Sequence, residues 1–282
     1  MNFILIGSVR NKIAKVILTC ATIMALLLSL GVVKQGFGIE FTGGVVYTLD
    51  APVEVSKAQL SENSSLTISG SQASSTVQMV SESVLTETQL AFIEKHKLAN
   101  DTIGASLGQE LIDASIKGMA LAFFAVMIYL SVRYNAIMAG ATLVALLHDI
   151  VFTVFVLALF DVQMSSIVVG ALLAIIGYSI NDSVVTLDRV RELIRVDEPF
   201  PVQSALEMTL QRNINTAVST LIVIVALLIF GGSSMQAFAM TMFIGVGVGM
   251  FSSLTIVPFL VTLKERTGAL TVARKPSLEG EL

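Results

Sequence analysis

Two ionisable residues lie inside or beside long apolar stretches of this 282-residue chain, where an uncompensated charge is costly. Asp182 precedes the charged pair Asp188-Arg189 by six positions, which corresponds to about 9 Å of helix. Arg212 opens the next apolar stretch. Low solvation disfavours a charged carboxyl, whereas a nearby arginine favours it, so such a carboxyl can take up and release a proton. We therefore expect Asp182 and Arg212 to form a proton pathway, with a purely structural ion pair as the alternative.

Asn181 and the pair His148-Asp149 extend this prediction. Asn181 directly precedes Asp182 and is assigned to the same pathway. Asp149 lies about a dozen residues into another apolar stretch, so it is also expected at membrane depth. For Asp149, a proton-relay role and a plain hydrogen bond between helices remain equally open. His148 is more simply interpreted as a packing residue whose hydrogen bonds are satisfied.

Glycines repeat at alternate positions in the last apolar stretch, at Gly245, Gly247 and Gly249. No strand pattern precedes this string and no lysine follows it, which argues against a nucleotide-binding loop. Gly245 and Gly249 are four positions apart and share one helix face, so they are predicted to allow close packing of another helix.

The sequence carries no pattern that is typical of a cofactor or of an enzyme. It contains no Walker lysine motif, no Ser-His-Asp set and no zinc-ligand spacing, and its single cysteine, Cys20, lies in an apolar run. We therefore expect no metal, no cofactor and no enzyme activity. The membrane potential is the expected energy source, since one charge crossing 100 mV yields about 2.3 kcal/mol.

The elements that would position these residues are apolar helices. The chain is 54% hydrophobic and only 13% charged, with a mean hydropathy of +0.83. A bilayer core is spanned by about 20 apolar residues in a helix. Runs of this kind are predicted at 14–33, 114–132, 136–160, 164–187, 214–231 and 236–263. The first run follows Arg10, Lys12 and Lys15 and is interpreted as an uncleaved signal anchor.

A polar segment, 34–112, separates the first two runs and is predicted to fold as a small α+β domain. Alternating apolar residues and turn signals predict its elements. Strands are expected at 45–49, 66–69 and 76–80, and helices at 56–62 and 86–97. This order suggests a ferredoxin-like arrangement. The expected fold class is therefore a membrane all-α bundle of six transmembrane helices with a small extracytoplasmic domain.

The distribution of Lys and Arg predicts the orientation of the chain in the membrane. Of the 17 Lys and Arg residues, twelve lie near the two ends of the chain, in a charged connection at 188–212, or at Arg133. Segments 1–13 and 267–282 are the two terminal regions in this prediction. The short connections at 160–163 and 231–236 carry none. Both termini are therefore expected in the cytoplasm, the 34–112 domain outside, and spans two to six within 113–266. The 267–282 tail is predicted to be disordered.

Two motifs resemble a known family. Gly38-Ile39-Glu40-Phe41-Thr42-Gly43-Gly44 resembles the Gly-Leu-Asp-Phe-Thr-Gly-Gly signature of the SecD/SecF export proteins, with glutamate in place of the usual aspartate. Gly177-Tyr178-Ser179-Ile180-Asn181-Asp182-Ser183-Val184-Val185 closely resembles the signature of the SecF branch. His148-Asp149 and the 212–220 stretch also match, so the similarity extends over nearly the whole chain.

The resemblance implies one half of a twelve-helix assembly with SecD, in the resistance-nodulation-division superfamily and the bacterial inner membrane. Such an assembly uses the proton motive force beside the SecYEG channel, with YajC as a further candidate partner, and acts on unfolded preproteins. In this family the residues matching Asp182 and Arg212 are associated with proton passage, and the outer domain is thought to move. No nucleic acid is expected as a partner.

Two other functions are weighed against this one. The first is a structural or assembly subunit that stabilises SecD and the channel, a role that does not require proton transfer. A small-molecule exporter of the same superfamily fits poorly, because the outer domain is small. The coupling ion, proton or sodium, is left open by the sequence.

Overall fold

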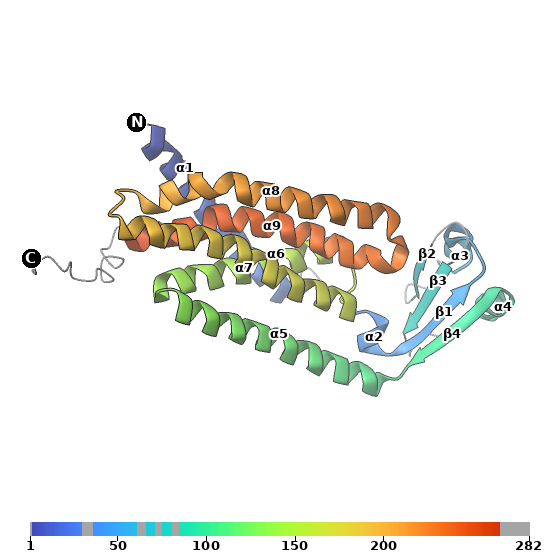
Figure 1. Ribbon diagram of the computed structural model, residues 1–282. Helices are drawn as coiled ribbons and strands as arrows, with labels where there is room; N and C mark the ends of the chain where they lie inside the picture. Colours follow the sequence, from blue (N-terminus) through green and yellow to red (C-terminus); the bar gives the residue numbers. More distant parts are fainter. Residues whose placement is uncertain (1, 30–35, 61–65, 71–74, 81–84, 266–282) are drawn as a thin grey trace, which may run out of the picture.

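The computed structural model describes residues 2–29, 36–60, 66–70, 75–80 and 85–265. Within these ranges, long helices form a bundle, and a small sheet domain (residues 44–103) lies at one end of it (Figure 1). The predicted tail 267–282 and the last part of the first predicted span lie outside the described residues, and so does part of the turn expected after residue 69.

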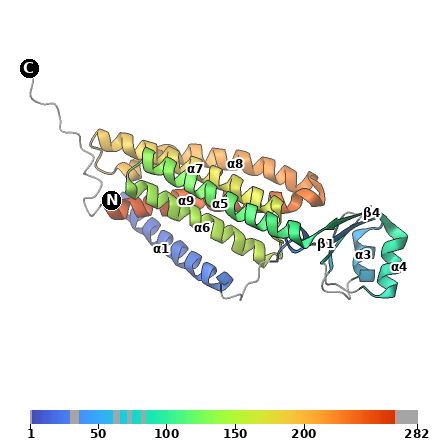
Figure 2. The same ribbon diagram turned by 90° about the horizontal axis from the view of Figure 1, so that it is seen from below.

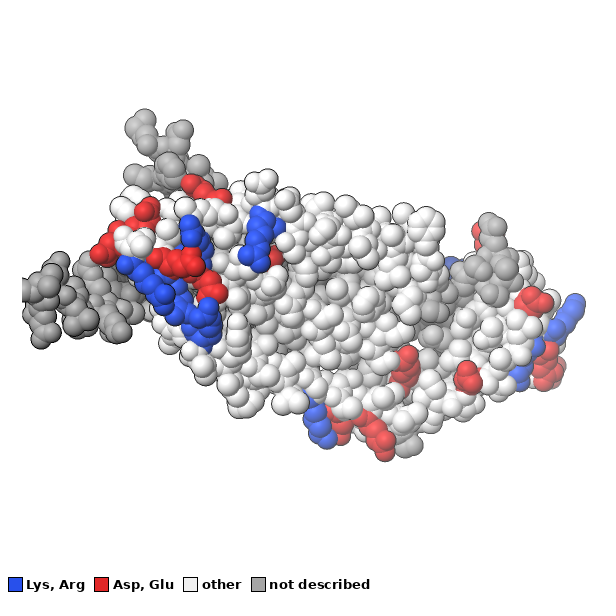
Figure 3. All heavy atoms as spheres, in the orientation of Figure 1, with Lys and Arg blue, Asp and Glu red and all other residues white. Residues whose placement is uncertain are grey.

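Five helices of the described chain are long and apolar enough to cross a membrane. They are α5 (Ala105–Arg133), α6 (Ala136–Leu159), α7 (Ser166–Arg195), α8 (Pro201–Phe230) and α9 (Gly232–Glu265). Their outer faces expose large apolar side chains, among them Val132 at 85% and Phe230 at 84%. On the face drawn in Figure 3, charged side chains gather at the end away from the sheet, on the sheet domain and along the lower edge, and they are sparse over the middle of the bundle. This distribution suits a bilayer rather than water.

Another long helix, α1 (Asn2–Ser29), packs beside α6 and α9. Its Ala14 is fully buried. Ile17 and Leu18 of the same helix contact the apolar core that lies at the end of the bundle away from the sheet. Figures 1 and 2 both place the start of α1 and the end of α9 at the end of the bundle away from the sheet.

The helix ends follow from local sequence signals. The side chain of Asn135 accepts a hydrogen bond from the amide of Met138 and caps α6, and Ser165 caps α7 through the amide of Val168. Pro201 opens α8, where a proline costs no helical hydrogen bond. The prediction of a charged connection over 188–212 is therefore wrong. Charged residues continue both helices beyond the apolar stretches, and the connection is only 196–200.

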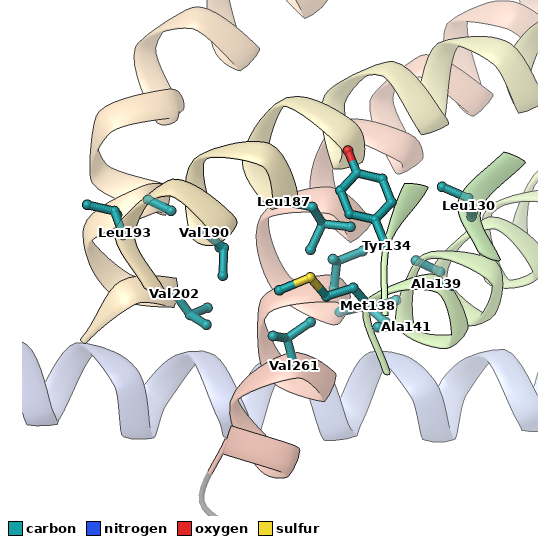
Figure 4. Close-up of a cluster of buried hydrophobic side chains, with 14 residues drawn as sticks. Leu130, Tyr134, Met138, Ala139, Ala141, Leu187, Val190, Leu193, Val202 and Val261 are labelled. Carbon is teal, nitrogen blue, oxygen red and sulfur yellow. The ribbon is translucent and has the colours of Figure 1, made fainter. Parts of the chain in front are cut away.

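The apolar core at the end away from the sheet joins several helices. Figure 4 shows Tyr134, Met138, Leu187 and Val261 lying close together, from the α5–α6 turn, α6, α7 and α9. Small residues such as Ala139 and Ala141 are buried in the same cluster. They let the α6 backbone approach its neighbours closely.

The sheet domain contains four antiparallel strands in the order β2-β3-β1-β4. They are β1 (Gly44–Leu49), β2 (Leu66–Gly70), β3 (Ser75–Val80) and β4 (Lys97–Ile103), with helices α3 (Val53–Leu60) and α4 (Glu87–His96). Both helices lie on one face of the sheet (Figure 2). Leu49, Leu60, Val77 and Ile93 form the core between them. The expected strands and helices are found within a few residues, whereas β4 was not predicted.

Candidate functional site

Asp149 lies at the centre of a fully buried polar network between three helices. Its Oδ2 accepts hydrogen bonds from Ser179 of α7 at 2.6 Å and from Ser252 of α9 at 2.8 Å. Its Oδ1 lies 3.0 Å from Nδ1 of the neighbouring His148. The side chain has no exposed surface. The network therefore holds α6, α7 and α9 together through one carboxylate.

The glycines of α9 allow this close approach. A Cβ added at Gly249 would lie 3.4 Å from the Cβ of Ser179 and 3.6 Å from Asp149 Oδ2. At Gly245 it would lie 2.2 Å from the terminal carbon of Ile175, which is buried. Both glycines thus face α7 of the same chain, as close packing requires.

Asp182 is buried on the α8 side of α7, with 2% of its surface exposed. Among the described residues its Oδ2 has no hydrogen-bond partner. The positive charge of Arg212 acts on this carboxyl. The two side chains nevertheless form none of the salt bridges found in the described chain. A buried carboxyl oxygen without a partner carries its full desolvation cost. In a structural ion pair, the partner charge would offset that cost, so Asp182 does not resemble a structural ion pair.

The same face of α7 continues as a polar stripe toward the end away from the sheet. Ser179, Asp182, Ser183 and Thr186 are all buried and follow helical spacing. Thr186 accepts a hydrogen bond from the Asn213 amide of α8 at 3.2 Å. The stripe therefore connects the Asp149 network to the α7–α8 contact beside Arg212.

Two of the predicted pathway residues lie outside this buried stripe. Asn181 is exposed on the outer surface of α7, so its side chain does not join Asp182. Arg212 is also exposed, and the polar residues Asn215 and Ser219 follow it at exposed positions of the same helix. Their spacing of three and seven positions from Arg212 places them on one face of α8.

The signature segment after α1 forms the short helix α2 (Ile39–Thr42). Glu40 accepts hydrogen bonds from the backbone amide of Ser166, at 2.8 Å, and from the Ser166 hydroxyl. Ser166 is the first residue of α7, so the carboxylate lies at the positive end of that helix. Gly43 and Gly44 follow α2 with φ of 76° and 150°, values that side-chain-bearing residues rarely adopt.

A second polar cluster lies at the opposite end of α7. Both carboxylate oxygens of Asp188 lie 3.0 Å from one Arg133 nitrogen, and Oδ1 accepts a hydrogen bond from the Tyr134 hydroxyl, also at 3.0 Å. Arg191 donates to the carbonyl of Arg133 at 2.8 Å. Burial, the hydrogen bond to Asp188 and its negative charge raise the pKa of Tyr134. The charges after the apolar part of α7 therefore fasten it to the α5–α6 turn.

Comparison with known proteins decides the family. The model of the family described as "Protein export membrane protein SecD/SecF, C-terminal" matches residues 80–266. The chain belongs to the SecD/SecF family. It is accordingly a multi-pass membrane protein.

Relatives within the SecD/SecF family cover most of the chain. The chain is 32% identical to the protein translocase subunit SecF of Sebaldella termitidis, over 87% of this chain and 88% of that protein. It is 31% identical to the SecF subunit of Escherichia coli O157:H7, over 83% and 80%.

The crystal structure of SecDF from Thermus thermophilus, a translocon-associated membrane protein, is similar with a TM-score of 0.76 and 27% identity. That similarity covers 94% of this chain and 39% of the SecDF chain. The chain thus spans well under half the length of this relative.

Sequence reasoning missed the partners of the acidic residues. Ser179 and Ser252 hold Asp149, and Ser166 holds Glu40. Serines are common in helices and often bond their own backbone, so their type alone gives no signal. Ser179 could have been noticed, because it lies three positions before Asp182 on the same helix face.

Proposed function

We propose that the chain works as the SecF-type subunit of a Sec protein translocase. With SecD, it uses the proton motive force to complete preprotein export through SecYEG. The observation that carries this proposal is the Asp182 carboxyl, which is buried in a membrane helix with one oxygen unpartnered. Ionisable groups at such positions are costly and mark ion pathways. The proposal gives the chain a transport role and no catalytic reaction.

Proton binding at Asp182 would change the forces between α7 and α8. When charged, the carboxyl is attracted by Arg212; when protonated, it loses this attraction and can donate a hydrogen bond. Asp149 is a second buried carboxyl in the same pathway; it accepts a hydrogen bond from Ser179, which lies three positions before Asp182 on α7. Taking up and releasing a proton therefore alternates two arrangements of the α7–α8 pair, which is what a proton-driven motor requires.

The exposed polar face of α8 supports a membrane partner. Arg212, Asn215 and Ser219 would face lipid in an isolated chain, at a cost that an adjoining polar helix removes. A protein named SecDF contains a region similar to this chain within a much longer polypeptide. We therefore assign SecD to this face. Association with SecYEG, YajC and unfolded preproteins follows from the family resemblance.

The proposal includes six membrane spans, with α1 as the first. Its contacts with α6 and α9 support this role, and an even number of spans puts both termini on one side. The distribution of Lys and Arg supports the cytoplasmic side of the bacterial inner membrane. The sheet domain then lies outside, and its strand order and helix placement support a ferredoxin-like fold.

The test is Asp182→Asn, which keeps the shape of the side chain and removes its charge. The matched control is Asp113→Asn, an exposed acid on α5. Export of a preprotein into membrane vesicles is measured with and without an uncoupler, together with co-purification of SecD. We expect Asp182→Asn to insert and to retain SecD but to lose the uncoupler-sensitive part of export. Unchanged stimulation in this variant would instead favour the structural or assembly subunit.

A further inference from the structure

The signature segment makes a dense set of contacts where the sheet domain meets the helix bundle. Besides the two hydrogen bonds from Ser166 to Glu40, the amide of Gly38 donates to the carbonyl of Met164 at 2.7 Å. The amide of Met164 donates to the carbonyl of Gly36, also at 2.7 Å. We call these contacts the signature clamp. It fastens the start of α7 to the chain just before the sheet.

The far side of α2 is held as closely. A Cβ on Gly108 of α5 would lie 2.3 Å from the carbonyl oxygen of Phe41, so only glycine permits this contact. A Cβ on Gly44 would lie 2.2 Å from the carbonyl oxygen of Met79 in β3. Since β1 begins at Gly44, α2 joins the sheet directly, without a flexible linker between them.

A cleft beside the clamp gives the sheet domain room to move. It has a volume of about 650 Å³ and is lined by Glu40 of α2, Gln78 of β3, Leu228 of α8 and Met240 of α9, among others. The sheet is therefore held through α2, which packs on α5, and β2 touches α9, while the cleft separates another part of the sheet from the ends of α8 and α9. Because α2 contacts α7 and connects directly to β1, a displacement of α7 would move α2 and, with it, the sheet.

Resting on the function proposed above, we infer that Glu40 is a positioning residue that couples α7 to the sheet domain. Ser166 and Asp182 lie on one continuous helix, sixteen positions or about 24 Å apart. Movement of α7 on protonation of Asp182 reaches Ser166, and the clamp transmits it through α2 to β1. The clamp stays closed during this cycle, and Glu40 has no part in moving the proton.

The experiment weakens the clamp and then replaces it. Glu40→Gln removes the charge, Ser166→Ala removes one donor, and Glu110→Gln, an exposed acid on α5, is the control. Phe37 and Met164 form a parallel bridge, a spacing within the reach of a disulfide. Phe37→Cys with Met164→Cys, in a Cys20→Ala background, therefore locks the clamp when oxidised and releases it when reduced. All variants are assembled with SecD and tested for uncoupler-sensitive export.

We expect Glu40→Gln to lower gradient-dependent stimulation about fivefold or more, a typical coupling between two sites. Ser166→Ala should lower it less, and Glu110→Gln should leave it unchanged. In the protein with Glu40 intact, the oxidised disulfide should preserve stimulation. In the Glu40→Gln variant, it should restore stimulation. Such a restoration would rule out a proton-carrying role for Glu40.

Two results would overturn the inference. The first is loss of stimulation when the disulfide is oxidised and its return when the disulfide is reduced. That result would mean that the clamp has to open in each cycle. The other is equal activity of the Glu40→Gln and Glu110→Gln variants. Normal stimulation in Asp182→Asn would separately remove the proton-driven function on which the inference rests.

Discussion

The Ser252 hydroxyl offers a quantitative test of the network around Asp149. Ser252→Ala removes one of two donors to Oδ2, leaving Ser179 at 2.6 Å. The hydroxyl also lies 3.1 Å from the carbonyl of Gly249, but the carboxylate is the nearer acceptor at 2.8 Å. The substitution therefore leaves a buried carboxylate with fewer donors and creates little space.

The distances from the two serine hydroxyls to Asp149 Oδ2 decide how large a loss of unfolding free energy we expect. Hydrogen bonds between helices in membrane proteins average about 0.6 kcal/mol, whereas bonds to charged groups contribute about 1.5–3 kcal/mol. Both distances to Asp149 Oδ2 are in or near the short range of bonds to carboxylates. We therefore expect Ser252→Ala to lower the free energy of unfolding by about 1.5 kcal/mol or more.

Chemical denaturation in detergent micelles measures this loss. The matched control is Ser253→Ala, since Ser253 is equally buried but donates to the carbonyl of Met250 in its own helix, at 2.9 Å. Ser179→Ala and the double variant complete a cycle, in which the second removal should cost more than the first. Equal losses for Ser252→Ala and Ser253→Ala would refute the claim that the carboxylate holds the three helices together.

Two further predictions concern packing and the far end of α7. Gly245→Ala should lower stability by about 1–3 kcal/mol, because its Cβ meets buried Ile175, and Ile175→Val should restore part of it. Gly247→Ala, which meets nothing, should be neutral or stabilising in the same thermal-unfolding assay. Tyr134→Phe should cost about 1–2 kcal/mol through the lost bond to Asp188. Because the pKa of Tyr134 is raised, the folded protein keeps this proton longer; stability should therefore fall as pH rises above about 10, and less so in Tyr134→Phe.

Much of the architecture could be predicted from hydropathy and local signals. The apolar stretches marked the long helices, because membrane helices need long runs of apolar residues. Alternation marked β1, β2 and β3. Strand β4 escaped because Lys97, Asn100 and Asp101 are atypical of strands, and nearly all of β4 is exposed at the sheet edge. Its position follows from pairing with β1, which the sequence does not reveal.

The candidate site was only partly predictable, for a related reason. Asp182 was conspicuous as a charge within an apolar run, and the structure buries it as expected. Asn181 next to it faces outward, since adjacent positions on a helix point in different directions. The contact between Glu40 and Ser166 joins residues 126 positions apart, and a local pattern carries no information on such pairs.

The lengths of α7 and α8 have a consequence for how the protein meets its surroundings. Each has 30 residues, or about 45 Å of helix, whereas the hydrocarbon core of a bilayer is about 30 Å thick. Their shared turn at 196–200 therefore extends beyond the hydrocarbon core. An epitope or fluorescent label inserted there would be reached from water, and it would report on the tilt of this hairpin without disturbing the buried carboxyls.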